Sequence, residues 1–130
     1  MTDPSAADDP FNPAALDMLR RLGNGTLLVR MIDIFLTNAP ERIAAARAAL
    51  QTDDRHSFEL AVHSLKSSSA QLGGMTLHRT AAAAERAGAS GDWASLSAQL
   101  DTIDIQFAAL RAWLEQAKAD AMTTPRETPP

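Results

Sequence analysis

The chain has 130 residues, enough for one domain with a single core, and an apolar fraction of 45% that is ordinary for a globular protein. A formal net charge of −4 gives no basic field for nucleic acid or an anionic membrane, and the lack of cysteine excludes disulfides and thiolate chemistry. No apolar run approaches the roughly 20 residues that span a bilayer. We therefore expect a cytoplasmic protein that is monomeric or weakly associating, rich in helix because alanine is abundant.

Both ends of the chain are polar and rich in proline. Residues 1–10 lack the apolar segment of a secretory signal and are predicted to be a disordered lead-in. Residues 121–130 are predicted to be a disordered C-terminal tail. The sequence thus predicts one domain over residues 11–120.

The first half of this domain predicts two helices. A short one is expected over residues 13–21, with Pro13 in its first turn, and it ends before the sequence Gly23-Asn24-Gly25. A long one is expected over residues 26–50, where apolar residues keep a helical spacing. Pro40 should kink this helix near residues 36–40.

The third helix is predicted over residues 54–72, after an aspartate that can cap it. One apolar stripe of this helix should face the core, and it comprises Phe58, Val62, Leu65, Ser69 and Leu72. Gly73 and Gly74 then end the helix.

A fourth helix is expected over residues 75–88 and should stop at Gly88. A fifth follows over residues 92–119, with Asp92 as its N-cap. Short connections between long helices favour antiparallel neighbours. The predicted fold is therefore all-α: an up-down antiparallel four-helix bundle with a short additional N-terminal helix.

His63 lies beside the core stripe of the third helix, about 100° from Val62 around the helix axis. The imidazole should therefore stand on an accessible face, with Lys66 and Ser67 one turn later. Such a histidine is an accessible nucleophile with a cation beside it, although many surface histidines have no function. The small serines could equally serve close helix packing, and Ser69 on the core stripe is expected to do only that.

The segment HSLKSSSAQLGG, residues 63–74, resembles the signature of histidine phosphotransfer (HPt) domains. The segment FLTNAPERIAAARAAL, residues 35–50, resembles the family's second long helix. Leu77 and Glu85 fall where the family has a leucine and a glutamate or glutamine. The resemblance covers residues from about 13 to 116. Ser67 departs from it, because the family usually has glycine four residues after the histidine, and this puts the fit of the partner in doubt. Gly74 in place of the commoner alanine is a minor departure.

The resemblance implies a phosphocarrier of two-component signal transduction, which relays a phosphoryl group between aspartates of receiver domains and has no kinase activity of its own. It implies that His63 is the phosphoacceptor, that Lys66 stabilises phosphoryl charge and that Glu85 orients the imidazole. Lys66 could instead be a solubilising residue, and Glu85 a solvated acid paired with its neighbouring arginine. The residues implied to contact the partner are Ser64, Ser67, Ala70 and Gln71.

The same resemblance implies no cofactor or metal on this chain, with Mg²⁺ supplied by the partner receiver domain. The partners would be response-regulator receiver domains and a hybrid sensor histidine kinase, with no nucleic acid and no membrane. One alternative is a helical adaptor that binds a receiver domain without carrying phosphate. Another is a metal-binding bundle using His56, Glu59, His63 and His78, but the stripe of the third helix that faces inward is apolar.

Overall fold

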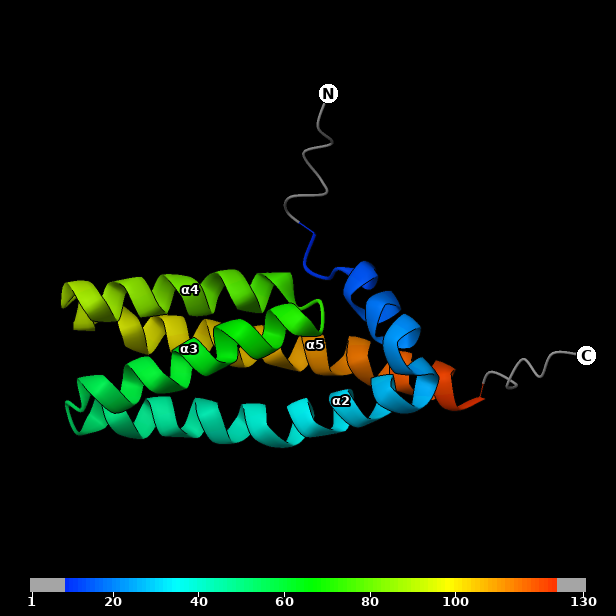
Figure 1. Cartoon of the computed structure of the whole chain (residues 1–130). Helices are drawn as coiled ribbons and strands as arrows, with labels where there is room; N and C mark the ends of the chain where they lie inside the picture. The colour runs from blue at the N-terminus through cyan, green and yellow to red at the C-terminus, as the bar shows by residue number, and fades with distance from the viewer. Residues whose placement is uncertain (1–8, 124–130) are drawn as a thin grey trace, which may run out of the picture.

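The computed structural model describes residues 9–123, and its regular elements there are helical apart from one isolated bridge between Phe11 and Gly74. The helices are α2 (Pro13–Gln51), α3 (Arg55–Gln71), α4 (Met75–Ser90), a short 3₁₀ helix η1 (Trp93–Ser95) and α5 (Leu96–Thr123) (Figure 1). The predicted all-α bundle is confirmed at this level. Of the predicted lead-in and tail, residues 1–8 and 124–130 lie outside the described part, and residues 121–123 belong to α5.

The N-terminal arm of α2 is joined to the rest of that helix across a kink. Gly23 and Asn24 have non-helical backbone angles, and Asn24 has a φ of 57°. The amide N–H of Thr26 donates to Oδ1 of Asn24 at 2.9 Å, which restarts the helix. The change of direction therefore falls at the predicted glycine-rich break, and α2 includes both predicted helices.

Two predicted features along the helices are corrected. Helix α2 keeps helical backbone angles at Pro40, which is exposed, and its non-helical angles and kink fall instead at Gly23 and Asn24. Helix α4 does not stop at Gly88 but continues to Ser90, with Gly91 as its left-handed cap at a φ of 85°. Gly88 is buried against Phe58, where an added Cβ would lie 3.3 Å from the ring, so it serves close packing.

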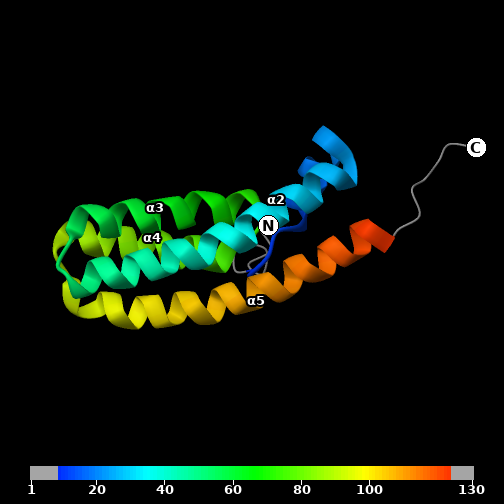
Figure 2. The ribbon, with the colours of Figure 1, turned by 90° about the horizontal axis from the view of Figure 1, so that it is seen from below.

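The core lies among the four long helices. Helix α3 packs against α2 and α4, and α5 closes the bundle by packing against the same two helices (Figures 1 and 2). The predicted stripe of α3 is buried along its whole length, and Asp54 caps the helix by accepting from the amide N–H of Ser57. Within the described residues, no helix is both long and apolar enough to cross a membrane.

A short segment before α2 ties the turn between α3 and α4 to α5. The amide N–H of Asn12 donates to the carbonyl of Gly73 at 2.7 Å, and that of Met75 donates to the carbonyl of Pro10 at 2.9 Å. The ring of Phe11 stacks on Trp113 with 4.8 Å between centroids. These contacts hold the end of α3 in place next to α4.

Candidate functional site

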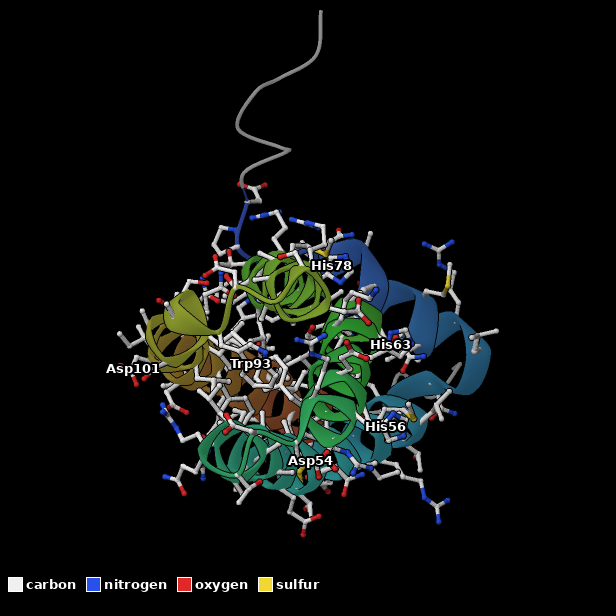
Figure 3. All side chains as sticks on the ribbon, turned by 90° about the vertical axis from the view of Figure 1, so that its left-hand side faces the viewer. Asp54, His56, His63, His78, Trp93 and Asp101 are labelled. Carbon is white, nitrogen blue, oxygen red and sulfur yellow. The ribbon has the colours of Figure 1, made fainter. Side chains whose placement is uncertain are left out.

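His63 stands on the outer side of α3, as predicted. Its side chain is 60% exposed, and the residues before and after it in the core stripe, Val62 and Leu65, are fully buried. Figure 3, viewed along the bundle, shows the imidazole outside the packed interior. The backbone of α3 is thus anchored on one face and presents His63 on another.

Glu85 on α4 reaches across to this imidazole. The distance from Nδ1 of His63 to Oε2 of Glu85 is 2.7 Å. An ionised carboxylate only accepts hydrogen bonds, so Nδ1 is the nitrogen that carries the proton. In the neutral ring, Nε2 then has a free lone pair.

The second oxygen of the same carboxylate binds Lys66. The Nζ of Lys66 donates to Oε1 of Glu85 at 2.6 Å, and both side chains are 27% exposed. The pKa of Glu85 is lowered, first by this hydrogen bond from Lys66 and then by the one from His63, against an opposing effect of burial. The three predicted residues therefore form one connected group, in which Lys66 and Glu85 neutralise each other's charge.

The close approach of α3 and α4 follows from small side chains. Ala81 and Ala84 are buried on α4, so the two backbones come near enough for Glu85 to reach both partners. His78 also joins the two helices, because its Nδ1 lies 2.8 Å from the carbonyl oxygen of Lys66. The sequence interpretation did not predict this role for His78. His78 precedes Glu85 by seven residues and thus shares its helical face, which was the available signal.

The metal-binding alternative finds no support in this arrangement. His78 donates to a backbone carbonyl and His63 to a carboxylate. Among residues 9–123, no three His, Cys, Asp or Glu side chains gather as a metal site requires.

The predicted partner-contact residues differ in their surroundings. Ser67 and Gln71 are exposed, and Ser64 and Ala70 are half-buried. Ser69 is fully buried and donates to the carbonyl of Leu65 at 2.6 Å, in line with its predicted packing role.

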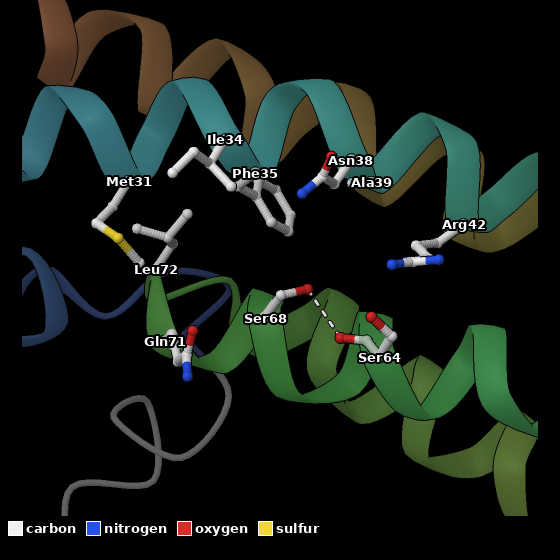
Figure 4. Close-up of a pocket in the computed structure, with 10 residues that line it drawn as sticks. All are labelled: Met31, Ile34, Phe35, Asn38, Ala39, Arg42, Ser64, Ser68, Gln71 and Leu72. Carbon is white, nitrogen blue, oxygen red and sulfur yellow. Dashed lines mark hydrogen bonds between the residues drawn. The ribbon is translucent and has the colours of Figure 1, made fainter.

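A groove lies between α2 and α3, and it is lined by Ser64, the residue after His63. It is drawn in Figure 4, and its lining comprises Met31, Ile34, Phe35, Asn38, Ala39, Arg42, Ser64, Ser68, Gln71 and Leu72. Two of the four predicted partner-contact residues, Ser64 and Gln71, line this groove, but the sequence interpretation named none of its residues on α2. Their spacing along residues 31–42 is that of one helical face, which is the signal that could have found them.

Known proteins share features with this chain in both sequence and fold. The family model described as "Hpt domain" matches residues 30–120. The crystal structure of histidine-containing phosphotransfer protein B (HptB) from Pseudomonas aeruginosa PAO1 is similar with a TM-score of 0.79, at 23% sequence identity, over 85% of this chain and 95% of that one. A search of curated proteins found no significant match.

The structural likeness shows a shared fold. The family match covers all of α3 and α4, and with them the group formed by His63, Lys66 and Glu85. The chain therefore belongs to the Hpt domain family, whose members are phosphocarriers that transfer phosphoryl groups through histidine in phosphorelays.

Proposed function

We propose that this chain relays a phosphoryl group between receiver-domain aspartates through a phosphohistidine at His63. The observation that carries the proposal is the 2.7 Å contact between Nδ1 of His63 and Glu85, on a side chain that is 60% exposed. This contact directs the proton to Nδ1 and leaves Nε2 as the nucleophile on the solvent side.

The transfer step needs little from this chain beyond position and charge. The lone pair of Nε2 attacks phosphorus in line with the bond to the aspartyl oxygen. The N–P bond forms as the P–O bond breaks, and the electron pair leaves with the receiver's carboxylate. The proton on Nδ1 stays in place, and Glu85 stabilises the positive charge that develops on the ring. The reverse step loads a second receiver domain.

Lys66 is proposed to stabilise the charge of the transferred phosphoryl group. It lies one helical turn after His63, and its ammonium group is held at 2.6 Å by the same carboxylate that binds the ring. No cofactor is proposed on this chain. Mg²⁺ would be supplied by the receiver domain and would offset charge on the phosphoryl oxygens there.

The docking surface is proposed to be the outer face of α3 together with the groove between α2 and α3. Ser64, Ser67 and Ala70 have small side chains that let another protein approach closely, and Gln71 adds a polar contact. Ser67 is exposed, so its hydroxyl can turn away from the arriving phosphoryl group. We expect transfer to survive this departure from the usual glycine.

The wider proposal keeps the expected setting. We propose that residues 11–120 form a cytoplasmic, monomeric domain without kinase activity. Its fold is proposed to be an up-down antiparallel bundle with a short additional N-terminal helix. Its partners would be receiver domains, including one in a hybrid sensor histidine kinase. An adaptor that carries no phosphate is not favoured, because such a module would not need Glu85 to hold both His63 and Lys66.

The decisive experiment is phosphotransfer from a phosphorylated receiver domain in the presence of Mg²⁺. We expect acid-labile, alkali-stable phosphate on the wild-type chain and none on His63→Gln. His56→Gln, which removes an exposed histidine earlier on α3, is the matched control and should be labelled normally. Label on His63→Gln would refute the assignment of the phosphoacceptor, and a wild type that no receiver labels would favour the adaptor.

A further inference from the structure

The charged side chains near His63 differ in whether they are paired. Lys66 is neutralised by Glu85, so these two residues present no net charge to an arriving protein. Arg42 on α2 is different. It is exposed at the rim of the groove, and no hydrogen bond or ion pair joins it to another residue within 9–123.

Its position links it to the reaction site. Arg42 lines the same groove as Ser64, which directly follows His63 in α3, and Figure 4 shows its guanidinium group extending from α2 toward that serine. The other end of the groove is largely apolar: Met31, Ile34 and Leu72 form it, with Gln71 beside Leu72 (Figure 4). A protein that covers this groove along its whole length therefore lies against Arg42.

Arg47, five residues later on the same helix, shows what an arginine of this bundle does when carboxylates are near. It binds both Asp101 and Asp104 on α5, and its pKa is raised by these two hydrogen bonds. Arg42 has the same chemical capacity, and no carboxylate of the described residues, 9–123, binds it. A guanidinium group offers a planar set of donors that matches a carboxylate in a bidentate pair.

We propose that Arg42 is a specificity-determining residue that binds a carboxylate on the surface of the docking receiver domain. The inference rests on the proposed function and names the chemistry of the partner's contact: an aspartate or glutamate placed where the receiver covers the α2–α3 groove. On a chain with a net charge of −4, a cation that lines the same groove as Ser64 also speeds the approach of an acidic surface.

The test separates binding from chemistry. Binding of the wild type and Arg42→Glu to Mg²⁺-loaded receiver domains from the same genome is measured by titration at low and high salt. His63 is separately phosphorylated with phosphoramidate, a small donor that needs no docking. We expect Arg42→Glu to bind roughly tenfold or more weakly with less salt dependence, and to be phosphorylated normally by phosphoramidate.

Two controls reverse the charge of another exposed arginine elsewhere on the surface. Arg111 is an exposed residue of α5, and Arg86 is an exposed residue of α4 that directly follows Glu85, so the controls are Arg111→Glu and Arg86→Glu. Both should bind nearly as the wild type does. Arg42→Lys keeps the charge without the planar set of donors and should lie between the wild type and Arg42→Glu.

The outcomes distinguish two failures. Equal loss with Arg86→Glu and Arg42→Glu would mean that a general field acts, and the specific contact would be refuted. Wild-type affinity of Arg42→Glu for a receiver that phosphorylates His63 would refute the inference and leave the proposed function intact. If no receiver of the panel binds or phosphorylates the wild type, the proposed function fails, and the inference fails with it.

Discussion

Replacing Glu85 by alanine removes the acceptor of the Nδ1 proton of His63 and the partner of Lys66 at once. A hydrogen bond to a charged group contributes about 1.5–3 kcal/mol. His63 is 60% exposed, so water replaces part of the lost acceptor, and the lower end of that range applies. Because about 1.4 kcal/mol changes a rate tenfold, we expect Glu85→Ala to accept phosphate roughly ten times more slowly.

The assay is single-turnover transfer from a phosphorylated receiver domain, with the tautomer of His63 followed by ¹⁵N NMR of the ring. Glu85→Gln keeps an oxygen acceptor and should lose less than Glu85→Ala. Glu59→Gln removes a carboxylate from α3 one turn before His63 and is the charge-matched control. A wild-type rate and an unchanged tautomer in Glu85→Ala would refute the orienting role.

Three predictions concern stability. Gly74→Ala should destabilise the fold by about 1–3 kcal/mol in urea unfolding, because the new Cβ would lie 2.4 Å from Cδ2 of the buried Leu110. Phe58→Ala should cost about 3–5 kcal/mol, because the ring is fully buried. The unfolding free energy should fall as pH drops below the ordinary value of 4.5 for Glu85, because Lys66 lowers its pKa in the folded state and the unfolded state binds the proton first.

The variants for comparison are Gly25→Ala, Leu60→Ala and Glu85→Gln. Gly25→Ala should be tolerated, because its Cβ would make only ordinary contact at 3.7 Å, and equal stability of Gly74→Ala would mean that the core yields. Leu60→Ala, on a side chain that is 59% exposed, should cost little beside Phe58→Ala. Glu85→Gln should flatten the acid limb of the pH profile, and an unchanged slope would exclude this carboxylate as its source.

Helical periodicity was sufficient to predict which residues form the core stripe of α3 and that His63 is exposed. Both depend only on the angle between residues around one helix. The glycines at the end of α3 were also identified from sequence. Gly73 has a φ of 80°, a conformation that side chains disfavour, and an added Cβ there would lie 2.4 Å from the carbonyl oxygen of Asn12.

Contacts between helices could not be predicted from the sequence, because they depend on how far one helix is shifted along another. Gly88 resembles a helix end in sequence, and only its contact with Phe58 shows that it serves packing. The bond from His78 to the carbonyl of Lys66 joins a side chain to a backbone across two helices. Arg42 is one of several polar residues on α2, and only the packing of α2 against α3 places it beside Ser64.

The stacked pair of Phe11 and Trp113 has a consequence for how the chain acquires its structure. The two rings lie near opposite ends of the described residues, so their contact closes a loop that contains the reactive helix and most of the core. During synthesis, Phe11 has no ring to stack on until α5 has left the ribosome. The hydrogen bonds of this segment to Gly73 and Met75 do not involve α5, so only the ring stack must wait for it. Because Trp93 packs on Phe58 elsewhere in the bundle, the fluorescence of Trp113 in a Trp93→Phe variant would report when the stack forms.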